Sequence, residues 1–149
     1  MAGNWWDPPS SVSGAGNKCV HLNCNPIDDP DTKPFRWHLG FHRQIIRSVI
    51  DHAKFEELLL KAAWHIKRNE SVVVFCGCRQ GRHRSVALAL ILQHVLDVVY
   101  GSLYAVVLEF ACSNRWTAFH RRCSSGACLD CSGPMPDNIG RALELWHSV

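Results

Sequence analysis

The sequence predicts an α/β fold with a small parallel sheet and flanking helices, followed by a cysteine-rich loop and a short helix. Residues 71–75 form a short, continuously apolar and valine-rich run, which is typical of a strand buried on both faces of a parallel sheet. Helical periodicity precedes this run, and a long apolar helix pattern follows it. Residues 19–24 and 103–110 are predicted as two further strands. Strands that alternate with helices indicate parallel pairing.

The helices are predicted from the spacing of apolar residues. A first helix begins near residue 41, because four aliphatic side chains fall on one face: Ile45, Ile46, Val49 and Ile50. A second helix is predicted from about residue 55 to residue 68. Residues 85–100 are apolar nearly all round, which predicts a helix in the middle of the fold that ends at Gly101. Asp137 is predicted as the N-cap of a short final helix.

The 149 residues are enough for one domain with a real core, which we expect at residues 18–149. Residues 1–17 are rich in glycine, serine and proline, so a disordered lead-in is predicted there. The N-terminus has no basic start followed by an apolar run, and the longest apolar stretch, residues 86–92, is too short to span a bilayer. We therefore expect a cytoplasmic protein with no membrane partner, whose cysteines are thiols or metal ligands.

The loop between the strand at 71–75 and the following helix has the composition of an anion-binding site. Gly77 and Gly81 let the backbone curl, so that N–H groups of residues 79–85 point inward at a helix N-terminus. Arginine and serine at the helix start supply a charged fork and a hydroxyl. The predicted site binds phosphate or sulfate, requires no cofactor, and consists of Cys78, Arg79, Gln80, Gly81, Arg82, His83, Arg84 and Ser85.

This loop fits C-x-x-G-x-x-R-[ST], and it resembles the phosphate loop of cysteine-dependent phosphatases. In those enzymes the cysteine is a thiolate nucleophile and the arginine grips the phosphoryl oxygens. The resemblance implies that Cys78 and Arg84 are catalytic. A general acid would come from the loop of Asp28, Asp29 and Asp31, and Asp29 is the assigned residue.

A second resemblance covers roughly residues 18–112 and is the more specific of the two. The stretch Gly77-Cys-Arg-Gln-Gly-Arg-His-Arg-Ser-Val86 is similar to that of the C-terminal domain of the RapZ RNase adapter family, which senses glucosamine-6-phosphate. The upstream segment Asn25-Pro-Ile-Asp-Asp-Pro30 and Gly40 are also similar. The resemblance implies a RapZ-like fold, a phosphosugar or other phosphate-bearing metabolite as ligand, and a binding role for Asp28.

Three functions remain open from the sequence: a regulatory, non-catalytic binding domain, a cysteine-dependent phosphatase, and an RNA-binding adapter. The RNA hypothesis rests on Arg121, Arg122 and the neighbouring cysteine-rich loop, and the net charge of +3 adds little to it. The sequence leaves the oligomeric state open.

Residues 113–136 contain a cysteine cluster with the spacing of a zinc site. The pattern is His120-x2-Cys123-x4-Cys128-x2-Cys131. Zn²⁺ takes four soft or borderline ligands in a tetrahedron, and Cys-x-x-Cys is a common spacing for two of them. The sequence therefore predicts a structural zinc held by these four residues.

Overall fold

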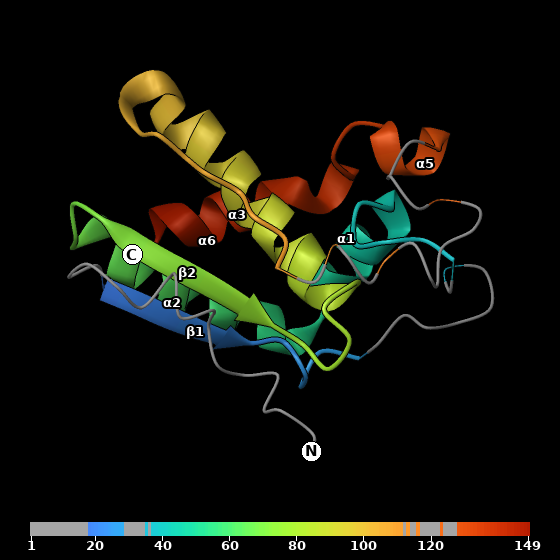
Figure 1. The fold of residues 1–149 in the computed structure, drawn as a ribbon. Helices are drawn as coiled ribbons and strands as arrows, with labels where there is room; N and C mark the ends of the chain where they lie inside the picture. The colour runs from blue at the N-terminus through green and yellow to red at the C-terminus, as the bar shows by residue number, and fades with distance from the viewer. Residues whose placement is uncertain are drawn as a thin grey trace, which may run out of the picture.

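The computed structural model describes residues 18–28, 35, 37–111, 113, 116, 123 and 128–149, and the predicted lead-in at 1–17 lies outside them. The predicted α/β class is confirmed (Figure 1). In chain order the elements are β1 (Lys18–Asn23), α1 (Arg43–Asp51), α2 (Ala53–Lys67), β2 (Val72–Gly77), α3 (Arg84–Tyr100), η1 (Gly101–Leu103), α5 (Leu129–Ser132), η3 (Asp137–Ile139) and α6 (Gly140–His147).

The sheet of the described residues consists of two parallel strands. Lys18 of β1 pairs with Val72 of β2, and the register continues to Asn23 and Gly77. Because the strands are parallel, both end at the same edge of the sheet. In open α/β sheets this carboxyl edge is where ligands bind.

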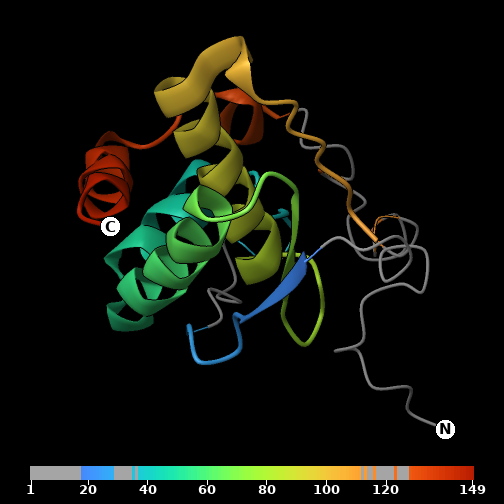
Figure 2. The same cartoon turned by 90° about the vertical axis from the view of Figure 1, so that its left-hand side faces the viewer.

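The helices lie on one face of this sheet (Figure 2). Val20 and Leu22 of β1 point into the core, and Val74 of β2 packs against it. On the opposite face His21 is exposed, and its ring contacts the half-buried Phe75 at 5.6 Å between centroids. The prediction that β2 is buried on both faces is therefore wrong for the described residues, since they place helices on one side only.

Both helices of the crossover are confirmed, and each begins at a histidine. The Nδ1 atom of His42 accepts a hydrogen bond from the backbone N–H of Gln44 at 3.1 Å, and His52 caps α2 in the same way. Burial lowers the pKa of His42, with a further contribution from His38 and opposition from Asp130. A neutral ring can accept this hydrogen bond, so the lowered pKa favours the cap.

Helix α3 is the central helix of the fold, as predicted. Its N-terminal half is buried, and Gly101, with φ of +54°, ends it. The segment Arg84–Leu103 is long and apolar enough to cross a membrane by length and composition. The helix packs against β2, α1 and α6, which accounts for its buried apolar residues, and its C-terminal end extends away from the sheet (Figures 1 and 2).

The predicted strand at residues 103–110 is wrong. Leu103 ends a 3-10 turn, and the residues after it form no ladder with any described strand. Leu103 and Val107 are 82% and 80% exposed. The segment instead borders a cavity of about 230 Å³ beside Val72 and Val74. Strand propensity acts through packing against a partner strand, so apolar composition alone did not determine the structure here.

The chain ends in the predicted helix, which packs on α2 and buries Trp146 completely. The ammonium group of Lys67 donates hydrogen bonds to the carbonyl oxygens of Trp146 (2.6 Å) and Val149 (2.9 Å). The predicted N-cap role of Asp137 is wrong, because this residue begins a 3-10 turn and its carboxylate pairs with Arg47 of α1.

Candidate metal centre and anion loop

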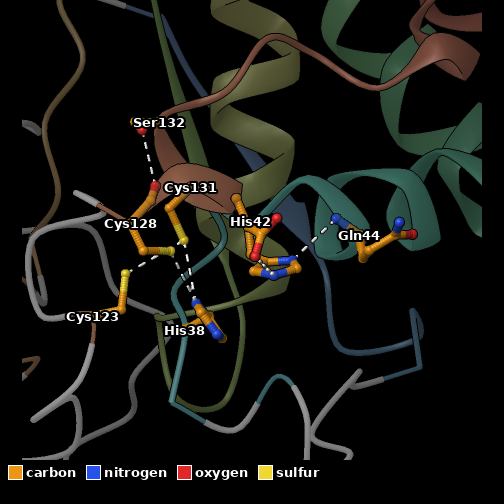
Figure 3. A network of polar contacts seen from close by, with 8 residues as sticks. His38, His42, Gln44, Cys123, Cys128, Cys131 and Ser132 are labelled. Carbon is orange, nitrogen blue, oxygen red and sulfur yellow. Dashed lines mark hydrogen bonds and ion pairs between the residues drawn. The ribbon is translucent and has the colours of Figure 1, made fainter.

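Three cysteines and one histidine converge beside the start of α1 (Figure 3). The ligand atoms of His38, Cys123, Cys128 and Cys131 all lie within 4.8 Å of one another, close enough to hold a metal ion. The Sγ atoms of Cys123 and Cys131 are 3.5 Å apart. The Nδ1 atom of His38 lies 3.6 Å from the sulfur of Cys128 and 3.4 Å from that of Cys131.

These distances can be compared with the edges of a tetrahedral zinc site. Zn–S bonds of about 2.3 Å and Zn–N bonds of about 2.05 Å place two sulfurs about 3.8 Å apart, and a sulfur and a nitrogen about 3.6 Å apart. These three separations agree with the tetrahedral values to within about 0.3 Å, and the other pairs of ligand atoms lie within 4.8 Å of each other. The four groups are therefore close enough together to serve as the ligands of one metal ion.

The Cys-x-x-Cys pair is positioned by the one-turn helix α5. Cys128 is its N-cap, and its carbonyl accepts hydrogen bonds from the backbone N–H of Cys131 (3.0 Å) and Ser132 (2.8 Å). This single turn places the sulfur of Cys131 within 4.8 Å of the sulfur of Cys128. Ser132 reinforces the turn, because its hydroxyl also donates to the Cys128 carbonyl at 2.9 Å.

The pKa values of the two cysteines in the Cys-x-x-Cys pair, Cys128 and Cys131, shift in opposite directions. Burial acts to raise the pKa of Cys128, but hydrogen bonds from Cys131, Cys123 and two backbone N–H groups outweigh it and lower the pKa. Burial, together with the same neighbouring thiols, raises the pKa of Cys131. A metal ion would replace the shared thiol protons with direct sulfur–metal bonds.

The sequence identified three of these four ligands. His120, the predicted fourth, lies outside the described residues, as do Arg121 and Arg122. Among the described residues, the structure places His38 beside the three cysteines, and the sequence analysis did not predict this histidine. No local signal could have found it, because His38 belongs to the segment before α1, far along the chain from the cysteine pattern.

The loop of residues 78–85, which the sequence predicts to bind an anion and which we call the anion loop, has the predicted strand, loop and helix order. It leaves β2 at Gly77 and enters α3 at Arg84, and Gly81 adopts the left-handed region with φ of +60°. Arg79 and Gln80 are exposed. The polar side chains that follow are buried at the start of the helix: Arg82, His83, Arg84 and Ser85.

The upstream motif segment lies directly against this loop. The side-chain oxygen of Asn25 accepts a hydrogen bond from the backbone N–H of Arg79 at 2.8 Å. The guanidinium Nη1 of Arg84 donates to the carbonyl oxygens of Asn25 (2.9 Å) and Ile27 (2.7 Å). The N–H of Gly81 donates to the Cys78 carbonyl. The prediction that the N–H groups of residues 79–85 all point inward to an anion is therefore wrong for Arg79 and Gly81, whose N–H groups donate to protein oxygens.

The structure describes only some of the predicted catalytic residues. The sulfur of Cys78 lies 3.1 Å from the hydroxyl oxygen of Ser85. Asp28 is at the surface, with its carboxylate 3.5 Å from His52 and its side chain 98% exposed. Asp29 and Asp31 lie outside the described residues.

Two further thiols stand near Cys78, at the carboxyl ends of the strands. Burial, and secondly the neighbouring Cys78, raise the pKa of Cys76 to about 12. Burial also raises the pKa of Cys24, which lies next to Gly77 through a 2.7 Å backbone hydrogen bond. Both groups are therefore neutral thiols at pH 7.

Comparisons of the chain with protein-family models, with curated proteins and with solved structures gave no match.

Proposed function

We propose that this chain is a RapZ-like binding domain that holds a phosphate-bearing metabolite at the loop of residues 78–85 and carries a structural Zn²⁺. The observation that supports the anion site best is the contact between two motif segments far apart in the sequence. Asn25 and Ile27 follow β1, the loop follows β2, and Arg84 joins them through two hydrogen bonds. This junction lies at the carboxyl edge of the parallel sheet.

The charge distribution at this edge suits an anion. The loop carries three arginines, and the first turn of α3 contains no acidic residue. A helix N-terminus adds partial positive charge, because its first N–H groups have no carbonyl partner within the helix. A phosphate group is the ligand that matches this combination of cationic side chains and helix terminus.

The exposed Arg79 provides the first test. Arg79→Ala is expected to weaken the binding of inorganic phosphate and of glucosamine-6-phosphate by about tenfold, because a charge-assisted hydrogen bond contributes about 1.5–3 kcal/mol. Isothermal titration calorimetry at low salt measures this. Arg68→Ala is the matched control: Arg68 is also exposed, and it stacks on Trp64 of α2 (4.6 Å). The proposal is wrong if the wild type binds neither ligand at millimolar concentration.

A closed, four-ligand site with three sulfurs is typical of structural zinc rather than of catalytic zinc, which keeps one position open. We therefore assign the ion to Zn²⁺ and the ligands to His38, Cys123, Cys128 and Cys131. The sulfur-rich donor set disfavours Mg²⁺ and Ca²⁺, which prefer oxygen ligands.

The alternative function, a cysteine-dependent phosphatase, is favoured by the short contact between Cys78 and Ser85. Two observations weigh against efficient turnover: Cys78 is only 7% exposed, and the carboxylate of Asp28 is turned to solvent beside His52. We expect aryl phosphate hydrolysis well below about 1 s⁻¹, the lower end of ordinary enzyme rates. A rate above that value, lost in Cys78→Ser, would establish the enzyme instead.

A further inference from the structure

The metal centre and the anion loop are joined by a segment of three residues. His38 points its Nδ1 atom at the cysteine sulfurs, while its own backbone carbonyl lies 2.8 Å from the Nε2 atom of His83 in the loop. Two residues later, the N–H of Gly40 donates a hydrogen bond to the carbonyl of Arg82 at 2.7 Å. The segment of residues 38–40 therefore supplies one candidate metal ligand and also makes two hydrogen bonds to the loop.

Gly40 shows how tightly this segment lies against the loop. A Cβ atom at this position would be 2.3 Å from the His83 carbonyl oxygen and 2.5 Å from the Ala87 nitrogen. Both atoms belong to the backbone at the junction of loop and helix. A displacement of the segment is therefore transmitted to the backbone of the loop and not merely to a flexible side chain.

A third contact reaches the loop from Trp116. The indole Nε1 of Trp116, which precedes Cys123 in the chain, donates a hydrogen bond to the Gly81 carbonyl at 3.3 Å. Trp116 also forms a small core with Leu39 and Val86, beside Phe41 and Phe110. Trp116 and the segment of residues 38–40 thus contact three successive loop residues, 81 to 83.

We propose that the metal centre positions the anion loop, so that zinc occupancy controls the affinity of the loop for an anion. The effect on anion affinity rests on the proposed function. Without the ion, only weak hydrogen bonds that involve thiols join His38 to the cysteines, and the segment of residues 38–40 loses its strongest anchor. The anion must then order the loop as it binds. If the competent conformation falls from full occupancy to about one tenth, the apparent Kd rises about tenfold.

The experiment compares zinc-loaded and chelator-treated protein by hydrogen exchange and by phosphate titration. Zinc removal is expected to speed amide exchange of residues 81–87 at least tenfold more than it speeds that of α2, and to weaken phosphate binding about tenfold. Equal acceleration in α2 and in the loop, or no acceleration, overturns the proposal. So does a protein that binds no zinc. If zinc-loaded protein binds no phosphate, the proposed anion function fails, and the exchange data alone then decide the coupling.

Substitutions of His38, which faces the cysteines and also contacts the loop through its carbonyl, provide a second test. His38→Ala removes the nitrogen ligand and keeps the backbone, whereas His38→Cys offers a thiolate in its place. Across both variants, loop exchange should follow the measured zinc content: fast where zinc is lost, slow where it is retained. Cys19→Ala is the matched control, because Cys19 is half-buried on β1 and outside the cluster, and it should change neither quantity. Loop exchange that does not follow zinc content overturns the proposal.

Discussion

Removal of zinc is expected to lower the unfolding temperature of this protein by about 8–16 °C. At free zinc of about 1,000 times Kd, a ligand that binds only the folded state adds about 4 kcal/mol of stability. For a chain of this size each kcal/mol shifts the unfolding temperature by about 2–4 °C. A bound ion would join His38 to cysteines near the other end of the chain, so its loss would free a long loop. Scanning fluorimetry with and without a chelator in reducing buffer measures the shift.

The same effect is expected from loss of a single ligand. Cys131→Ser should abolish stoichiometric zinc binding and lower the unfolding temperature as far as chelation does, because Cys131 is buried at the centre of the cluster. Cys19→Ser, in a cysteine outside the cluster, should leave both unchanged. Protein purified in reducing, chelator-free buffer that contains no zinc and takes up none on titration would contradict the assignment.

A methyl group added at Gly40 is expected to destabilise the protein by about 3 kcal/mol or more, the upper end for overpacking. The new Cβ would collide with the His83 carbonyl and the Ala87 amide nitrogen, and backbone atoms cannot move aside as a flexible side chain can. Gly40→Ala should therefore separate the segment of residues 38–40 from the start of α3. Equilibrium denaturation by urea, compared with the wild type, measures the change in unfolding free energy.

Gly140→Ala is the matched control for this substitution. Gly140 begins α6, and a Cβ there would meet no atom within 4 Å. Replacement of an unstrained helical glycine should stabilise the protein by about 0.4–1 kcal/mol, because alanine restricts the unfolded chain. Gly40→Ala with an unfolding free energy equal to that of Gly140→Ala would show that the segment does not press on the loop.

Local periodicity was sufficient to predict α1, α2, α3 and α6, whereas the one-turn helix α5 was not predicted. The four aliphatic residues of α1 face the core as expected, and α3 ends at Gly101, whose positive φ follows from the absence of a Cβ atom. These features depend on neighbours within one turn of the chain, so they can be derived from the sequence. The two strands at residues 18–23 and 72–77 were also predicted to within a few residues.

Features that depend on a packing or pairing partner distant in the sequence were predicted poorly. Residues 103–110 have strand-like composition, yet Val107 is largely exposed and no described strand pairs with them. Asp137 has a good capping side chain, but its carboxylate pairs with Arg47. In both cases a partner distant in the sequence, or its absence, decided the outcome over local propensity.

The sequence by itself determined the chemistry available to this protein: three cysteines at zinc-knuckle spacing, and a strand, glycine loop and helix with three arginines. Only the tertiary structure decided which groups meet. It placed His38 beside the cysteines, turned Arg84 toward the carbonyls of Asn25 and Ile27, and laid Gly40 against the loop. Metal ligation and backbone hydrogen bonding depend on distances of a few ångströms between atoms remote in the chain, and residue spacing carries no information about such distances.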